Sequence, residues 1–287
     1  LNAFVLYFAL PCMLFRFGAG TPVLDLLNPT LLAVWLLVAA GVVAATVWLT
    51  IGPAVPLKDA AFGALVAAFP NTGFMGVPLL VALLGPAAAG PAICVLTADL
   101  VVTTTACLAL AEAQGQGGQG LWKAARRILL GVTRNPMPWA IALGATFSAM
   151  GWPLWGPADA VVKMLADAAS PVALFTIGAV LWRAGRHAHT RTPLRRHAPV
   201  AATKLLLHPL LVLALGLGAQ AIGLPLDDFA LMVIVLVAAL PSASNVAILA
   251  ERYGADTGRV ARIVMGSTVA AFVSFTAVAW LFGVRPA

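Results

Sequence analysis

The chain has 287 residues, of which 62% are hydrophobic and only 9% are charged, and its mean hydropathy is +0.99. Soluble domains of ordinary composition are far more polar, so these values indicate an integral membrane protein. The net charge of +7 lies in a few loops between apolar stretches, which favours a role in membrane topology over nucleic-acid binding. Cys12, Cys94 and Cys107 lie in apolar segments without metal-ligand spacing, so neither a metal site nor a disulfide framework is expected.

Apolar stretches of about 20 residues recur along the whole chain, and an α-helix of that length crosses a hydrocarbon core of roughly 30 Å. We therefore predict an all-α membrane protein with nine spans in this chain. The predicted spans are residues 2–17, 31–50, 59–84, 90–111, 136–151, 160–183, 197–222, 228–250 and 258–283.

Residues 113–135, between the fourth and fifth spans, join a glycine- and glutamine-rich half to a basic, amphipathic half. The first half is expected to be a flexible linker, and the second an interfacial helix. Basic residues gather in this segment and in the loop at 183–197, which marks the cytoplasmic side, whereas the opposite loops carry aspartates and almost no Lys or Arg. The carboxyl terminus is therefore expected outside.

Two segments at a constant offset of 160 residues resemble each other. "ALPCMLFRFGAG" (9–20) and "ASPVALFTIGAV" (169–180) share a proline, a leucine, a phenylalanine, a glycine and an alanine at matching positions. Chance similarity between apolar helices is the alternative to a true repeat. Five spans separate the two starts, an odd number, so the two copies must enter the membrane from opposite sides. The sequence thus predicts an inverted repeat.

The repeat divides the chain into a first copy at 1–112, the linker at 113–135 and a second copy at 136–287. The second copy has five predicted spans, whereas the first has four and lacks a partner for the span at 136–151. We therefore expect that one amino-terminal helix is missing from this chain and that the complete protein has ten spans in a five-plus-five arrangement.

Two spans carry a proline near their middle, followed by amide and hydroxyl side chains: "AFPNTGFMG" around Pro70 and "ALPSASNVA" around Pro241. Proline removes an N–H group and clashes with the preceding turn, so such a break is tolerated in lipid only where protein or a water-filled cavity surrounds it. Asn71 and Thr72 are expected to cap the helix that follows, and Gly73 to let a backbone or a substrate approach.

Paired breaks in two inverted repeats indicate the binding site of a secondary transporter. The N–H groups and the positive dipole end of a half-helix attract an anion such as a carboxylate. The alternative is that both prolines merely kink packed helices. The predicted substrate-binding residues are Pro70, Asn71, Thr72, Gly73, Pro241, Ser242, Ser244 and Asn245.

Asp99 is the one acidic residue deep in a predicted span. An intramembrane carboxylate is a functional hypothesis by default, so Asp99 is the candidate for coupling to H⁺ or Na⁺; a hydrogen bond to a neighbouring helix is the alternative. The equivalent region of the second copy has Ser267 and Thr268 instead. Lys204 and Arg16 lie within or near the ends of their spans. They could attract an organic anion, but snorkelling to the interface is the favoured interpretation.

At these motifs the chain resembles the auxin efflux carrier family, whose bacterial members include malonate transporters. The matching pieces are "LNAFVLYFALPCMLF" (1–15), "FPNTGFMGVPLL" (69–80), "RNPMPWAIALG" (134–144), "SPVALFTIGAVL" (170–181), "KLLLHPLL" (204–211) and "ALPSASNVAILAERYG" (239–254). The resemblance implies ten helices in a fold like that of sodium/proton antiporters and bile-acid symporters, with the broken helices crossing at their prolines. It also implies elevator-type movement against a scaffold of spans one, five and six, and it places Asn71 and Asn245 nearest the substrate.

We therefore expect a secondary active transporter, not an enzyme, that needs no cofactor and moves a malonate-like or auxin-like mono- or dicarboxylate across the bacterial inner membrane. Its expected partners are the lipid bilayer and a second copy of the chain in a homodimer. The alternatives are an ion-coupled antiporter or bile-acid-type symporter of the same fold, and a non-transporting membrane protein that senses a ligand. A membrane enzyme would need convergent acids and histidines in the spans, where only Asp99 and His208 qualify.

Overall fold

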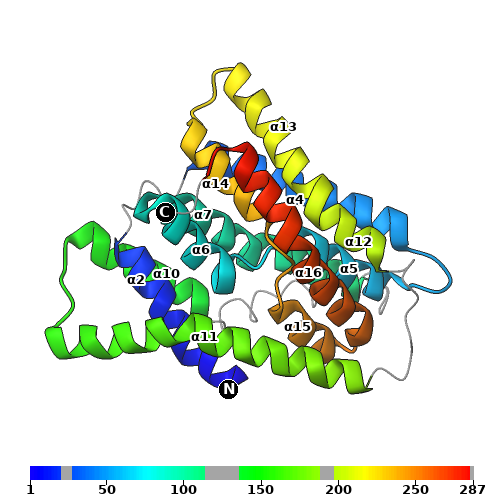
Figure 1. Cartoon of the computed structure of the whole chain (residues 1–287), viewed down its shortest axis with the longest axis horizontal. Coiled ribbons are helices and arrows are strands. Elements are labelled where there is room, and N and C mark those ends of the chain that lie inside the picture. The colour runs from blue at the N-terminus through cyan, green and yellow to red at the C-terminus, as the bar shows by residue number, and fades with distance from the viewer. Residues whose placement is uncertain (21–27, 114–135, 188–196, 285–287) are drawn as a thin grey trace.

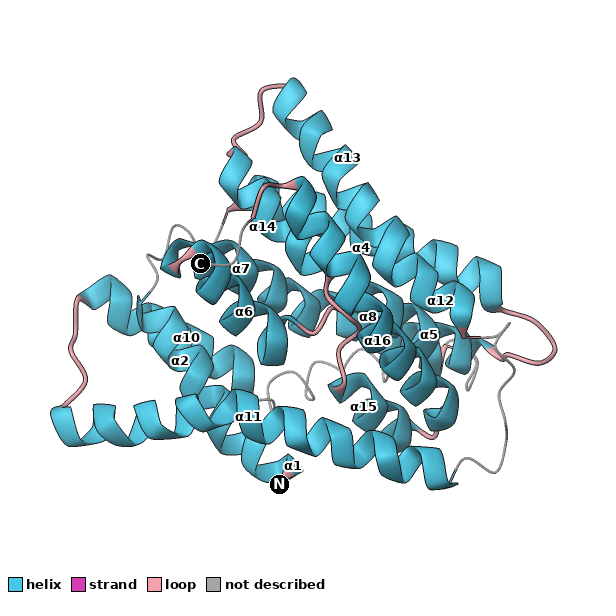
Figure 2. Ribbon diagram, viewed as in Figure 1, coloured by secondary structure: helices cyan, strands magenta, loops and turns pink. Residues whose placement is uncertain are grey.

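The computed structural model describes residues 1–20, 28–113, 136–187 and 197–284, and these ranges are helical with no strand among them (Figures 1 and 2). The first half contains α1 (Asn2–Phe4), η1 (Val5–Ala9), α2 (Leu10–Gly20), α4 (Pro29–Thr50), α5 (Leu57–Ala68), η2 (Thr72–Gly76), α6 (Val77–Leu84), η3 (Pro86–Ala88), α7 (Ala89–Ala98), η4 (Asp99–Thr103) and α8 (Thr104–Glu112). The second half contains α10 (Pro136–Met150), α11 (Gly156–His187), α12 (Ala198–Ala202), η6 (Thr203–Leu207), α13 (His208–Ala221), α14 (Asp228–Ala239), α15 (Asn245–Tyr253) and α16 (Thr257–Leu281). Segments η1, η2, η4 and η6 are π-helical, and η3 is a 3₁₀ turn.

The all-helical prediction is confirmed for the described residues. Four helices among them are long and apolar enough to cross a membrane: Pro29–Thr50, Pro86–Glu112, Ala198–Ala221 and Thr257–Leu281. Shorter apolar helices are Thr72–Leu84, Trp139–Met150 and Asp228–Ala239. The count of nine spans and the inverted repeat stay predictions, and residues 114–135, where the linker and the interfacial helix are predicted, lie outside the described residues.

Helices α2, α10 and α11 pack together as one group, at the lower left of Figure 1. A Cβ atom added to Gly18 would lie 2.8 Å from the carbonyl oxygen of Ile141, and one added to Gly144 would collide with that of Phe15. The backbones of α2 and α10 therefore approach each other as only small residues allow, which is a common way to join helices in membranes. These are the helices that correspond to predicted spans one, five and six.

A second group surrounds α5 and α14. Helix α5 packs on α4 and α8, and α14 packs on α13 and α16. Every residue from 60 to 69 and from 233 to 240 is buried. The two helices that end at the predicted breaks are therefore enclosed by protein, where neighbouring groups can satisfy an interrupted backbone.

Candidate functional site

The two predicted spans that carry the mid-span prolines are interrupted, and their breaks meet. The amide of Asn71 donates to the carbonyl oxygen of Pro241 at 2.8 Å. In return, the amide of Ala243 donates to the carbonyl oxygen of Phe69 at 2.9 Å. Each break thus supplies a hydrogen-bond partner to a backbone group of the other break. We call this meeting point, residues 69–73 and 240–245, the crossover.

The local sequence explains where the helices stop. A residue before proline is disfavoured in the α region, and Phe69 and Leu240 are extended, with ψ angles of 102° and 155°. The segments they begin run antiparallel, and Pro70 pairs with Ser242 in an isolated bridge. The position of Pro70 and Pro241 in the chain therefore fixes the crossover between α5 and η2 on one side and α14 and α15 on the other.

The helix starts at the crossover have no side-chain cap, as is also true of α5 and α12. Three other helix starts have a side-chain oxygen that accepts a first-turn amide: Asn28 before α4 at 3.0 Å, Asp227 before α14 at 2.7 Å and Asp256 before α16 at 2.8 Å. Neither η2 nor α15 has such a bond. The prediction that Asn71 and Thr72 cap the following helix is therefore wrong, and the Thr72 hydroxyl instead donates back to the carbonyl oxygen of Pro70 at 3.4 Å.

Four side-chain oxygen atoms at the crossover are buried and have no hydrogen-bond partner within the described protein: Asn71 Oδ1, Ser242 Oγ, Ser244 Oγ and Asn245 Oδ1. A hydroxyl can turn to donate or accept, and an asparagine amide offers both an acceptor and a donor edge. Buried polar groups are almost always paired in folded proteins, so such a concentration calls for an explanation. The two serine hydroxyls can donate to a ligand that accepts hydrogen bonds, and the two asparagines can do so through Nδ2.

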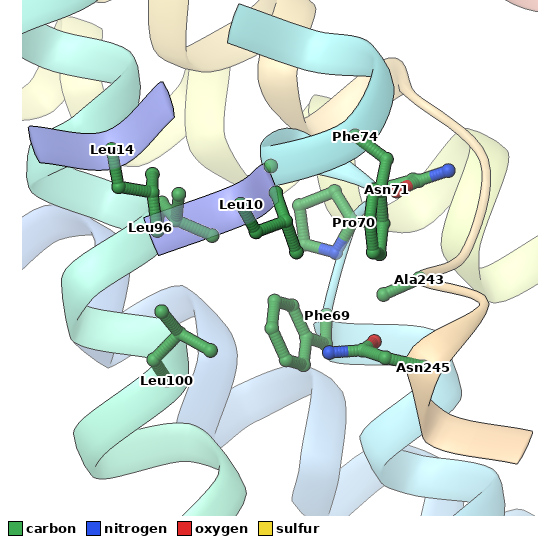
Figure 3. A pocket seen from close by; sticks show the side chains of 11 residues that line it. Leu10, Leu14, Phe69, Pro70, Asn71, Phe74, Leu96, Leu100, Ala243 and Asn245 are labelled. Carbon is green, nitrogen blue, oxygen red and sulfur yellow. The ribbon is translucent and has the colours of Figure 1, made fainter. Parts of the chain in front are cut away.

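A cavity opens at the crossover (Figure 3). The space free of protein atoms there measures about 320 Å³ with open solvent included, and the cavity volume itself is about 20 Å³. Its lining residues are Leu10, Leu14, Phe69, Pro70, Asn71, Gly73, Phe74, Leu96, Leu100, Ala243 and Asn245. Leucines from α2 and from the α7–η4 helix form one wall, and the two asparagines lie on the opposite side in the view of Figure 3. None of these lining residues is charged, so an anion would be held by hydrogen bonds and helix dipoles.

The cavity separates the predicted substrate-binding residues into two sets. Four line it: Pro70, Asn71, Gly73 and Asn245. The other four do not line it and lie in the adjoining crossover backbone: Thr72, Pro241, Ser242 and Ser244. Sequence reasoning missed the leucine wall, because leucine occurs on every face of an apolar span and carries no positional signal.

Asp99 is fully buried beside α4. Its Oδ1 atom accepts hydrogen bonds from the indole N–H of Trp35 at 2.9 Å and from the hydroxyl of Thr103 at 2.8 Å, whereas its Oδ2 atom has no hydrogen-bond partner in the described protein. The hydrogen bond from Trp35 on α4 is the contact expected if Asp99 serves only to bind a neighbouring helix. It accounts for one carboxylate oxygen and leaves the other open.

Lys204 does not reach the interface, so the expectation that it snorkels is wrong. Its side chain is 0% exposed. The ammonium donates to the carbonyl oxygen of Ala238 at 2.6 Å and lies 3.1 Å from Nδ1 of His208. Position 204 is nearly two turns into the helix that begins at Ala198. What buries it is the packing of α13 and η6 against α14, which span length alone does not reveal. The available sequence signal for a buried Lys204 was the histidine four residues further on, because residues at that spacing lie on the same face of a helix.

Arg16, Ser267 and Thr268, which the sequence also singled out, have structural partners. Arg16 forms an ion pair with Asp159 at 2.6 Å, between α2 and α11. The Ser267 hydroxyl accepts the amide of Ser242 at 3.2 Å and so supports the second break. Thr268 donates to a carbonyl oxygen of its own helix.

A helical, multi-pass membrane protein in which two interrupted helices meet at a largely apolar cavity with two asparagines has the architecture of a membrane transporter. The chain belongs to the membrane transport protein family, which matches residues 1–279. This result confirms the resemblance to the auxin efflux carriers that the sequence motifs indicate.

Relatives of the chain are named as transporters rather than enzymes. A "Putative malonate transporter" of Rhizobium meliloti is 28% identical over an alignment that covers 100% of this chain and 88% of the relative. An "Uncharacterized transporter" of Methanothermobacter thermautotrophicus is 29% identical, over 73% of this chain and 64% of the relative. The "Uncharacterized transporter YfdV" of Escherichia coli K12 is 27% identical, over 78% and 68%.

Proposed function

We propose that the chain is a secondary transporter of a small organic anion and that the anion's carboxylate binds at the crossover. The observation that carries the proposal is the set of four buried, unpartnered side-chain oxygens beside two helix starts that have no side-chain cap. First-turn amides of a helix have no intrahelical acceptor, and the dipole makes that end attractive to negative charge. A carboxylate can accept hydrogen bonds from the first-turn amides, from the serine hydroxyls and from the Nδ2 groups of the two asparagines.

The leucine wall supports an organic rather than an inorganic anion. Leu10 and Leu14 come from α2, and Leu96 and Leu100 come from the helix that carries Asp99. These side chains offer an apolar surface opposite the amides, where the carbon skeleton of a mono- or dicarboxylate can pack. The name of the Rhizobium meliloti relative supports malonate as the first substrate to test.

Two helix groups suit an elevator-type movement. We assign the scaffold to α2, α10 and α11, and the moving domain to the helices around α5 and α14. Because the cavity takes Leu10 and Leu14 from the first group and its asparagines from the second, sliding of one group past the other would carry the site away from the leucines of α2. We further propose that the protein acts as a homodimer in a bacterial inner membrane, with its carboxyl terminus outside.

Counterflow in proteoliposomes tests the proposal, because exchange across the membrane needs no driving ion. Vesicles loaded with unlabelled malonate should accumulate labelled malonate through the wild-type chain, and a panel of other mono- and dicarboxylates should compete according to their fit. Asn71→Ala and Asn245→Ala should each raise the half-saturating concentration about tenfold or more, since a hydrogen bond to a charged group is worth roughly 1.5–3 kcal/mol.

Asn28→Ser is the matched control, because it removes an amide but keeps a capping oxygen at the start of α4. It should leave counterflow unchanged. Unchanged half-saturation in both crossover variants, for the best carboxylate of the panel, would contradict binding at the crossover. Absence of counterflow for every carboxylate would contradict the substrate class.

A further inference from the structure

A second group of polar residues lies beside the crossover and is fully enclosed. It joins four helical segments, and we call it the Asp99 cluster: Trp35 on α4, Asp99 and Thr103 on η4, Lys204 on η6 and His208 on α13. The exposed fraction is 0% for Trp35, Asp99, Lys204 and His208, and 4% for Thr103. A carboxyl, an amine and an imidazole therefore share one interior that is closed to the protein surface in this conformation.

Asp99 and Lys204 interact electrostatically, and Trp35 and His208 lie between them. The ammonium of Lys204 is the cation whose electrostatic field reaches the Asp99 carboxyl. The indole of Trp35 donates to Asp99, and its ring centre lies 5.1 Å from the imidazole of His208, which in turn contacts Lys204. Burying a charge is costly unless an opposite charge and hydrogen bonds compensate it. An ionised Asp99 with a protonated Lys204 is such a compensated pair, with no net charge.

Both charged residues also touch the helices that build the crossover. Lys204 donates to the carbonyl oxygen of Ala238, in the last turn of α14, three residues before Pro241. A cation at that end of a helix interacts favourably with its dipole. Asp99 lies between Leu96 and Leu100, which line the cavity. A change of charge in the cluster is therefore felt at both sides of the site.

The ligands around Asp99 suit a proton and not a metal cation. The groups that contact its Oδ1 atom are hydrogen-bond donors, from Trp35 and Thr103, and the nearby ammonium of Lys204 repels cations. Hard cations need several oxygen ligands, which these donors cannot supply. A proton needs a single lone pair, and Asp99 Oδ2 is a buried acceptor without a partner in the described protein.

The backbone is π-helical at both Asp99 and Lys204. Asp99 begins the π-helical segment η4, and Lys204 lies in the π-helical segment η6. Such segments weaken regular helical hydrogen bonding and are frequent at functional sites. Here they occur at the two positions where opposite charges enter the interior.

We propose that the Asp99 cluster is the coupling site of the transporter, that it takes up one proton for each monovalent anion bound at the crossover, and that Lys204 is its permanent internal cation. The inference rests on the proposed function. It names the coupling ion as H⁺ and excludes Na⁺.

The charges balance in every step. The empty protein holds ionised Asp99 and protonated Lys204, which sum to zero. Binding of a monovalent anion adds one negative charge at the crossover, and a proton from the same aqueous side bonds to Oδ2 of Asp99 and adds one positive charge. On the opposite side the proton returns to water as the anion leaves. No other group is consumed.

Three further titratable groups face these atoms in the described protein. Lys204 and His208 approach from η6 and α13, and Cys107 of α8 feels the charge of Asp99. His208 accepts from the protonated Lys204 through Nδ1, which assigns its hydrogen to Nε2, an atom without a partner among the described residues. His208 thereby holds the ammonium in place rather than competing for the proton.

Gradient-driven uptake into proteoliposomes of a labelled monocarboxylate that shows counterflow tests the coupling ion, because such an anion carries the single charge that one proton balances. A gradient of about one pH unit, acidic outside, should support up to about tenfold accumulation for one proton per anion. An inward Na⁺ gradient should have no effect. Asp99→Asn should abolish the pH-driven accumulation but retain counterflow, because the crossover is intact. Asp167→Asn, an exposed aspartate on α11, is the matched control and should behave as the wild type.

A substrate-free measurement separates this inference from the proposed function. Infrared difference spectra of the purified protein should show a protonated-carboxyl band on acidification that Asp99→Asn removes and Asp167→Asn retains. Loss of counterflow for all carboxylates with this band present would refute the proposed function but not the proton site. Na⁺-driven accumulation, pH-driven accumulation that survives in Asp99→Asn, or a band that Asp99→Asn does not remove would overturn the inference.

Discussion

The crossover and the Asp99 cluster are adjacent polar regions in the same apolar interior, but their hydrogen bonds are distributed in opposite ways. At the crossover the backbone is paired across the two breaks, while four side-chain oxygens have no partner within the described protein. In the cluster Asp99 Oδ1 accepts from Trp35 and Thr103 and the Lys204 ammonium donates to α14, so each charged group has protein partners, although Asp99 Oδ2 has none in the described protein. The difference indicates that the crossover is organised to receive a ligand, and that the cluster holds its own charges.

The largest expected effect is the loss of the internal cation. Lys204→Met leaves Asp99 without its opposite charge, and breaking a buried pair by removing one partner costs about 3–5 kcal/mol of unfolding free energy. The cost should be greatest at alkaline pH, where Asp99 is ionised, and should shrink on acidification, because a proton then neutralises the carboxyl. Unfolding in detergent, followed at several pH values, measures this.

The double variant Asp99→Asn with Lys204→Met is its control, since it removes both charges and should recover most of the lost stability. Lys163→Met, which removes an exposed lysine of α11, should change little. A Lys204→Met protein as stable as the wild type at alkaline pH would show that the two charges do not depend on each other.

The crossover should respond in the opposite way. Asn71→Ala or Asn245→Ala removes a side-chain oxygen that has no protein partner, so the free energy of unfolding should change by less than about 1 kcal/mol, while anion affinity falls about tenfold. The measurement is unfolding without ligand beside malonate binding to the same samples. A large loss of stability without ligand would mean that these amides serve the fold.

The smallest expected effect concerns the helix starts. Asp227→Ala removes a 2.7 Å cap from α14 and should cost about 1 kcal/mol of unfolding free energy. Ser244→Ala, at the uncapped start of α15, should cost nothing measurable without ligand. Thermal unfolding of both variants, each compared with the wild type, measures the difference. Equal losses would remove the distinction between structural and ligand-ready helix starts.

The parts that could be predicted are those with a strong local signal. Mid-span prolines followed by amides and hydroxyls in "FPNTG" and "LPSASN" located both breaks, because few other residues interrupt a membrane helix. The cap expected from Asn71 and Thr72 was wrong, since neither side chain accepts a first-turn amide of η2 and the Thr72 hydroxyl donates to the carbonyl oxygen of Pro70. Lys204 was misjudged because its distance from a helix end says nothing of the helices that cover it. Which leucines face the cavity depends on tertiary packing and leaves no mark in composition.

The central claim is that the anion lies at the crossover. The most direct test is an electron cryo-microscopy structure of the protein with the carboxylate that gives the strongest counterflow. The account predicts ligand density whose carboxylate lies within hydrogen-bonding distance of the Asn71 and Asn245 side chains, with its carbon skeleton against Leu96 and Leu100. Ligand density at another place, with the crossover cavity empty, would contradict it.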